Sequence, residues 1–263
     1  MKKEKNIYKP IPGILGDATD YHVYTMTLKD KITGFLIAFA IAFAAIMIFF
    51  REIVFSIIVG VIAGICFQKP YNNYLCQKRS NKLLNDFRSL LESLATSYTS
   101  GRNTQGAFED ALSDLVSIYG EDADISKEAQ IIADGLHNNI NIEDLLRNFA
   151  DRSGLDDISS FADVFEVSFR QGANINRIIS STRDIINDKI SVQMDIETAI
   201  SGGKNELNVM MIMPFVVFLG LSGLGGSMTI VTNTFTNVVV KLVVLAIFVG
   251  AYVIGRKIMT IKI

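Results

Sequence analysis

Residues 32–67 decide the class of this protein, because they read ITGFLIAFAIAFAAIMIFF at 32–50, RE at 51–52 and IVFSIIVGVIAGICF at 53–67. The first run carries no charge, and at about 1.5 Å per residue it nearly crosses a hydrocarbon core of roughly 30 Å. The second run is shorter, but Gln68 and Lys69 behind it can reach the interface by snorkelling. The pattern predicts a transmembrane hairpin that turns at the charged pair, with a re-entrant second segment as the alternative.

A second pair of apolar runs lies near the C-terminus, at 207–228 and 238–255. Between the two pairs, residues 68–206 have the composition of a soluble protein. The whole chain of 263 residues is 49% hydrophobic and 20% charged, and its mean hydropathy is +0.33. These features indicate a membrane protein with a soluble module inside it. They exclude a secreted enzyme, a disordered chain and a disulfide scaffold.

Basic residues predict the orientation in the membrane. They gather in three places: Lys2, Lys3, Lys5, Lys9, Lys29 and Lys31 in the N-terminal tail, Lys69, Lys78, Arg79 and Lys82 after the second run, and Arg256, Lys257 and Lys262 at the C-terminus. The opposite side has only Arg51, with Lys241 near that boundary. The positive-inside rule therefore predicts a multi-pass protein of the cytoplasmic (inner) membrane with both termini and the module in the cytoplasm.

The predicted fold class is all-α, a polytopic membrane protein with four transmembrane helices and a cytoplasmic six-helix bundle. The expected segments are a cytoplasmic N-terminal tail (1–31), a transmembrane hairpin (32–68), the helical bundle (69–206), a second transmembrane hairpin (207–255) and a basic cytoplasmic tail (256–263). We expect Gly60 and Gly64, a GxxxG pair, to mediate helix packing in the membrane. We expect Pro214 to kink the third span.

The soluble module reads as helical throughout, because apolar residues recur at spacings of three and four. They are Leu83, Leu84, Phe87, Leu90, Leu91, Leu94 and Tyr98 in the first helix. The breaks between helices predict six segments, at 82–99, 104–119, 125–137, 142–151, 157–171 and 175–200. Gly101, Asn139, Gly172 and Asn174 are the predicted turn residues. Gly202 and Gly203 are predicted as a hinge to the membrane, with a plain helix cap as the alternative.

An internal repeat supports this division. The pattern Leu90, Leu94, Tyr98, Gly101, Ala107, Phe108, Ala111, Leu115 returns 71 positions later as Phe161, Phe165, Phe169, Gly172, Ile178, Ile179, Thr182, Ile186. A shift of 38 positions returns its middle part as Ile132, Leu136, Asn139, Leu145, Leu146 and Phe149. Each unit is a helix, a tight turn and a helix, and three such hairpins make a six-helix bundle.

The soluble module is strongly acidic, because residues 83–206 contain 22 acids and 10 bases, a net charge of −12. Nucleic-acid binding is therefore excluded as a function. Five acids gather at predicted loops and helix starts: Glu121, Asp122, Asp124, Asp156 and Asp157. They are the candidate docking residues for a basic partner, and the alternative is an acidic face that is merely solvated.

The chain contains no pattern that indicates catalysis. The stretch Gly202-Gly203-Lys204-Asn205 lacks the spacing of a P-loop. The two histidines, His22 and His137, are far apart, and the two cysteines have no partners at metal-ligand spacing. We therefore predict a protein that is not an enzyme and that holds no cofactor or metal.

The layout resembles the type II secretion system F family, the inner-membrane platform proteins of type IV filament machines. Within it the chain is similar to the TadB/TadC type of tight-adherence (Flp) pilus systems, and it is TadB-like. The resemblance covers about residues 80–260. In the bundle it rests on Gly101 and Ala107 after a Leu-rich helix, on Phe161 and Phe165, and on Arg170-Gln171-Gly172-Ala173-Asn174-Ile175. Near the membrane it rests on Ser201-Gly202-Gly203-Lys204 before Pro214 and on Gly255-Arg256-Lys257. Ala173 and Asn139 stand where the family usually has glycine.

The resemblance implies a platform protein of a type IV pilus or type II secretion-like machine. Such a protein couples a hexameric assembly ATPase in the cytoplasm to the extraction of pilin subunits from the lipid bilayer, together with a sister platform protein or further copies of itself. The presence of one bundle domain favours the tight-adherence branch. Two other functions remain open from the sequence: a transporter or channel component with a regulatory helical domain, and a membrane scaffold without a motor.

Overall fold

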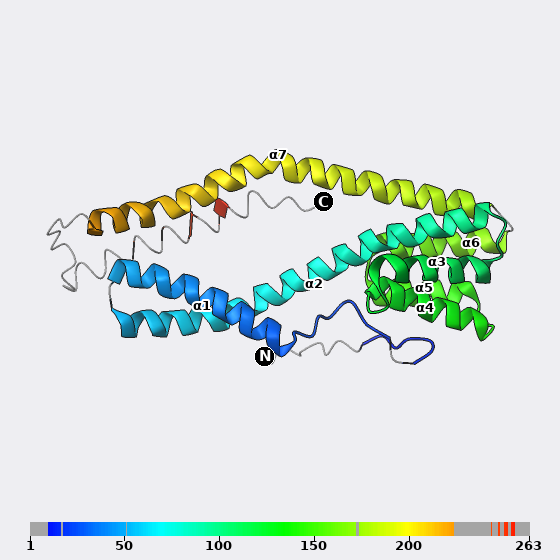
Figure 1. Ribbon diagram of the computed structural model, residues 1–263, viewed down its shortest axis with the longest axis horizontal. Coiled ribbons are helices and arrows are strands. Elements are labelled where there is room, and N and C mark those ends of the chain that lie inside the picture. Colours follow the sequence, from blue (N-terminus) through cyan, green and yellow to red (C-terminus); the bar gives the residue numbers. More distant parts are fainter. Residues whose placement is uncertain are drawn as a thin grey trace, which may run out of the picture. The chain divides into compact units, whose positions relative to one another are not determined.

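The structure, a computed structural model, describes residues 10–16, 18–50, 52–171 and 174–223, together with 243, 247, 250, 251, 254 and 255. These residues form seven α-helices and no β-strand (Figure 1). The helices are α1 (Leu28–Phe50), α2 (Ile53–Thr99), α3 (Thr104–Tyr119), α4 (Asp124–His137), α5 (Ile142–Ser153), α6 (Asp156–Arg170) and α7 (Ile175–Gly223). The all-helical class is thus confirmed. The end of the third predicted span, most of the fourth and the basic C-terminal tail lie outside the described residues.

Two helices are longer than the sequence pattern predicts. The predicted second span and the predicted first bundle helix are parts of one helix, α2, which has 47 residues and contains Pro70. The last helix does not end at 200, because α7 has 49 residues and continues through Gly202 and Gly203 to Gly223. Glycine lowers helix propensity by about 1 kcal/mol relative to alanine but keeps its N–H donor, so a helix can pass through it.

The chain divides into two compact units. One contains the described residues up to Thr25 together with Asn72–Ile190, and the other contains Met26–Tyr71 with the described residues from Ser191 onward. The sequence predicts residues 1–31 as a separate tail. Instead, the described residues between 10 and 25 belong to the unit that holds α3, α4, α5 and α6. Tyr21, which is 3% exposed, is part of its core.

The core of this first unit confirms the helical periodicity. In α2, Leu83, Phe87, Leu90, Leu91 and Leu94 are all buried. Ring contacts extend this face, since Phe87 lies edge-on to Phe161 with centroids 5.5 Å apart, a geometry that adds to the stability gained from burial. Along the chain α3 packs on α4, α4 on α5, and α5 on α6.

The repeat at 71 positions is visible in the burial of equivalent side chains. The pairs Leu90 and Phe161, Leu94 and Phe165, Phe108 and Ile179, and Leu115 and Ile186 are all fully or almost fully buried. The first members lie on α2 and α3 and the second members on α6 and α7. The repeat therefore reflects two helical hairpins that contribute the same positions to one core.

In the second unit, α1 packs on the first part of α2 through small residues. A Cβ atom added to Gly64 would lie 2.5 Å from Cδ2 of Phe35, and one added to Gly60 would lie 2.9 Å from Cδ2 of Phe39. The predicted helix-packing glycines thus face aromatic rings of α1. Glycine permits this close approach of the two helices because it has no side chain. Pro214, the other predicted packing residue, lies inside α7.

Helices α1 and α2 are long and apolar enough to cross a membrane. Only 11% of the apolar window of α1 and 17% of that of α2 is buried within the structure. The core helix of a soluble protein would instead be mostly buried. Large apolar side chains such as Ile41 and Val54 are exposed on these helices. Their pattern fits a lipid-facing surface, and the coarse prediction of a membrane protein stands on these two helices.

We expect Gly64→Ala to lower the melting temperature of the full-length protein in mild detergent, because the new methyl group would overlap the ring of Phe35. The matched control is Gly202→Ala, at a helical glycine with open space around its Cβ position. This change should leave the melting temperature unchanged or raise it, since alanine is the better helix former. Circular dichroism measures both, and equal melting temperatures for the two variants would contradict the close approach of α1 and α2.

Candidate partner-binding site

The first predicted acidic cluster lies at the turn between α3 and α4, but its members differ in their contacts. Asp124 accepts two hydrogen bonds from the guanidinium of Arg79, at 2.7 and 2.6 Å. The hydrogen bond with Asp124 raises the pKa of Arg79 above its usual value. Asp122 forms an ion pair with Lys127 at 3.4 Å. Glu121 is exposed, and no ion pair with a described residue is found for it. Asp124 therefore holds α4 to α2, and Glu121 is the acid left for a partner.

The second predicted cluster likewise contains one acid that pairs within the fold and one that is exposed. Asp157 accepts a hydrogen bond from Nζ of Lys189 at 2.6 Å, which ties the start of α6 to α7. Asp156 is exposed in the first turn of α6, where a carboxylate is favoured by the helix dipole. Only Asp156 of this pair presents its carboxylate to solvent. Two of the five predicted docking residues, Asp124 and Asp157, thus form ion pairs within the fold.

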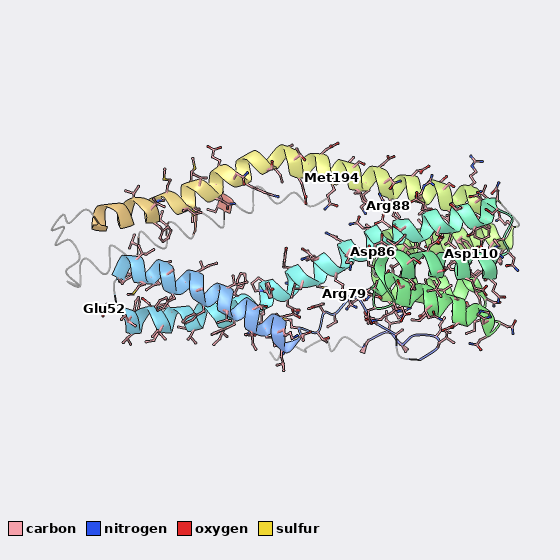
Figure 2. The ribbon with its side chains drawn as sticks, viewed as in Figure 1. Glu52, Arg79, Asp86, Arg88, Asp110 and Met194 are labelled. Atoms are coloured by element: carbon pink, nitrogen blue, oxygen red, sulfur yellow. The ribbon has the colours of Figure 1, made fainter. Side chains whose placement is uncertain are left out.

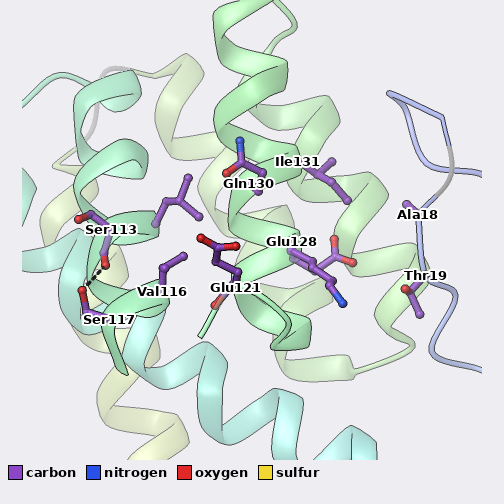
Figure 3. A pocket seen from close by; sticks show the side chains of 12 residues that line it. Ala18, Thr19, Ser113, Val116, Ser117, Glu121, Glu128, Gln130 and Ile131 are labelled. Atoms are coloured by element: carbon purple, nitrogen blue, oxygen red, sulfur yellow. Dashed lines mark hydrogen bonds between the residues drawn. The ribbon is translucent and has the colours of Figure 1, made fainter. Parts of the chain in front are cut away.

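A groove of about 640 Å³ lies beside Glu121, between α3 and α4 (Figure 3). Its lining comes from α3 (Leu112, Ser113, Val116, Ser117), from Glu121, from α4 (Ser126, Lys127, Glu128, Gln130, Ile131) and from Ala18 and Thr19. The hydroxyl of Ser126 is buried at this groove without a hydrogen-bond partner. Such a group costs free energy unless a ligand or water satisfies it. We call this hollow the α3–α4 groove.

A buried ion pair lies next to the groove, and the sequence analysis missed it. Arg152 of α5 donates to both carboxylate oxygens of Glu128 of α4, at 2.6 and 2.5 Å. Both side chains are 1% exposed. Tyr21 donates its hydroxyl to the same carboxylate at 2.9 Å. Burial raises the pKa of Tyr21, and the charges of Glu128 and Asp124 raise it further, so the phenol remains a neutral donor.

A sequence signal for this pair did exist. Glu128 follows Ile125 by three positions and precedes Ile132 by four, so it occupies the apolar stripe of its helix. Arg152 follows Leu145 by seven and Phe149 by three, in the same kind of position. Opposite charges at core positions of consecutive helices indicate a buried pair, because an isolated buried charge is too costly.

The N-terminal strap, defined here as the described residues between 10 and 25, lies on this ion pair. Arg152 donates to the carbonyl oxygen of Thr19 at 3.0 Å, and the backbone N–H of Tyr21 donates to the carbonyl of Arg152 at 2.9 Å. Asn148 of α5 donates to the carbonyl of Pro12 at 3.0 Å. On the other side, the guanidinium of Arg79 lies 4.9 Å from the centre of the Tyr21 ring. The strap is therefore held at Pro12, at Thr19 and at Tyr21.

Asp86 is a second charged group inside this unit. It lies on α2 two turns after Arg79 (Figure 2) and is 5% exposed. Burial raises the pKa of its carboxyl group, the charge of Asp124 raises it further, and Lys82 partly opposes the shift. The folded state therefore favours the protonated form of Asp86.

The predicted turn residues occupy the helix ends that they mark. Gly101 has φ 82° and Asn139 has φ 57°, both in the left-handed region that glycine and asparagine tolerate. Asn174 precedes α7, and its side-chain oxygen accepts from the backbone N–H of Arg177 at 3.3 Å. Gly172 lies outside the described residues. Gly202 and Gly203 lie inside α7, so the predicted hinge has no break in the helix.

Comparison with protein-family models, with curated proteins and with solved structures found no match to this chain. Within the described residues, no group of three or more His, Cys, Asp or Glu side chains is arranged to hold a metal ion. The α3–α4 groove, with Glu121 at its edge, is the candidate site.

We expect Arg152→Met to destabilise the protein by about 3–5 kcal/mol, because it leaves the Glu128 carboxylate buried without its counter-charge. The matched control is Arg147→Met on the same helix. Arg147 pairs with Asp163 and Glu166 at the surface, where ion pairs contribute little. Thermal unfolding of the full-length protein in detergent measures both. A melting temperature for Arg152→Met equal to that of the control would contradict the structural role of the buried pair.

We expect Asp86→Asn to stabilise the protein at pH 7. The folded pKa of Asp86 lies above its unfolded value, so the stability that its carboxyl contributes is complete below the unfolded pKa and is lost as the pH rises through the folded pKa. The gain should disappear near pH 3–4, about the pKa of an unperturbed aspartic acid. Melting temperatures across this range test the prediction, and a gain that is independent of pH would contradict it.

Proposed function

We propose that this protein is an inner-membrane platform of a type IV pilus, of the tight-adherence (Flp) type, or of a type II secretion-like machine. One observation carries the proposal. Helices α2 and α7 each belong in part to the unit with the apolar helices and in part to the unit with the helical core, and each crosses the boundary between the units as one helix. Pro70 of α2 and Pro214 of α7 each remove one backbone hydrogen bond, but the other bonds keep each helix continuous along its axis. In the proposed platform, a push on the core passes along both helices.

The proposal includes the finer arrangement expected from the sequence: four transmembrane spans, a cytoplasmic six-helix bundle and both termini in the cytoplasm. The bundle contacts a hexameric assembly ATPase, and the spans help lift pilin subunits out of the bilayer. A sister platform protein or a second copy of the chain completes the platform. The excess of acids over bases in residues 83–206 supports a basic partner for the bundle.

The contacts described above reduce the proposed docking residues to Glu121, Asp122 and Asp156. Glu121 and Asp156 are exposed, and the weak pair of Asp122 with Lys127 leaves Asp122 accessible. Reversal of Asp124 or Asp157 to lysine would break contacts with Arg79 or Lys189. Loss of binding in such variants would not identify a partner surface.

Deletion of the gene should abolish surface filaments or secretion, and the wild-type gene should restore them. We expect Ile190→Pro to fail in this complementation, because proline in a helix interior removes a hydrogen bond and kinks the helix. Ile190→Ala is the control, since it keeps the backbone of α7 and loses only the partly buried side chain. Electron microscopy counts the filaments, and immunoblots of membranes confirm equal amounts of protein.

A deletion strain with normal filaments and normal secretion would overturn the platform function. Full complementation by Ile190→Pro at normal protein levels would keep the platform and overturn the transmission of motion along α7. Solute flux through the purified protein in liposomes would favour a transporter, and stable partners without an ATPase would favour a scaffold.

A further inference from the structure

The α3–α4 groove has the chemistry of a site for a cation. Its acceptors include the carboxylate of Glu121, which points into the groove in Figure 3. Gln130 donates its amide N–H to Asp134 at 2.8 Å, so its amide oxygen remains as an acceptor. Ser126 belongs to the lining, and its hydroxyl is buried without a hydrogen-bond partner. The exposed acceptors of Glu121 and Gln130 favour a hydrogen-bond donor in the groove.

Lys127 is the one lysine of the lining among the described residues, and it forms an exposed ion pair with Asp122. Arg152, behind the lining, is engaged by Glu128, Asn148 and the Thr19 carbonyl. An anionic ligand would therefore have to compete with Asp122 for Lys127. A cationic one would find Glu121.

The rest of the lining is apolar. Leu112 and Val116 are half-buried on α3, and Ile131 is half-buried on α4. An aliphatic stem of three or four methylene groups suits such a floor, because arginine and lysine lay their stems on apolar surface and keep their charged heads at its edge. A small metal ion would leave this floor uncovered.

We propose that the α3–α4 groove holds a lysine or arginine side chain of a partner protein. The stem lies on Leu112, Val116 and Ile131, and the head binds Glu121 and the amide oxygen of Gln130. The identity of the partner rests on the proposed function: it is the assembly ATPase. The groove, and not the acidic start of α6, is then the docking point.

The strap forms one wall of this site. Ala18 and Thr19 line the groove, and Thr19 is held by Arg152 through its carbonyl oxygen. Glu128 joins the two features, since it lines the groove and binds both Arg152 and Tyr21. The groove is therefore complete only when the strap is in place.

The test measures the affinity of the purified assembly ATPase, encoded in the same genome, for the full-length protein in mild detergent. Glu121→Gln and Glu121→Lys should weaken binding in that order, the second by about tenfold or more, because a like charge then faces the incoming cation. The control is Asp151→Lys, which reverses an exposed acid of α5 outside the groove and should bind as the wild type does. Asp156→Lys on α6 tests the second acidic cluster, and it should lose binding only if that cluster is the docking point.

A second measurement locates the contact directly. The photo-crosslinker p-benzoylphenylalanine at Ser117, on the exposed rim of the groove, should form a covalent adduct with the purified ATPase. The same crosslinker at Asp151 should not. Adducts are identified by mass spectrometry of the joined peptides, and the ATPase peptide should contain lysine or arginine.

The outcomes separate the two proposals. If the wild type binds the ATPase and both Glu121 variants bind equally well, the groove is not the docking point, although the platform function stands. If Asp156→Lys alone abolishes binding, the second acidic cluster replaces the groove. If the wild type does not bind the ATPase at all, the platform function fails, and the partner assigned to the groove fails with it.

Discussion

The first unit depends on one buried ion pair. Glu128 and Arg152 are both almost fully buried, and moving two charges out of water costs several kcal/mol per ion. That cost is offset only where the geometry is close to ideal, and here Arg152 uses four donor contacts while Glu128 accepts from Arg152 and Tyr21. The pair therefore specifies one arrangement of α4, α5 and the strap, because any other register leaves a buried charge without its partner.

This constraint explains why the strap is part of the core and not a tail. Tyr21 supplies a neutral donor to Glu128 and is itself almost fully buried. Arg79 then packs its guanidinium on that ring while it holds Asp124. A chain of contacts thus runs from α5 through the strap to α2. Asp86, on the same helix as Arg79, is a buried acid whose pKa is raised by burial. This region therefore combines ion pairs with one carboxyl group that lowers the stability of the folded state at neutral pH.

The sequence predicted what depends on local periodicity. The bounds of α3 match the expected 104–119, and the apolar positions of α2 are buried as expected, because a spacing of three and four reports one helix face. The strap was not predicted, since the burial of Tyr21 depends on Glu128, 107 positions away. The contacts of Asp124 and Asp157 were missed for the same reason. The predicted break at Gly202-Gly203 failed because glycine weakens a helix without removing a hydrogen bond.

The strap also gives the proposed groove a mechanical consequence. Thr19 lines the groove and Thr25 ends the strap, and α1 begins three residues later at Leu28. A partner that binds only the complete groove stabilises the seated strap, and by linkage a seated strap strengthens the partner's binding. Release of the strap would remove the contacts that Thr19 and Tyr21 make with the Glu128–Arg152 pair. In the proposed platform, the strap is a third covalent connection between the core and the apolar unit, beside α2 and α7.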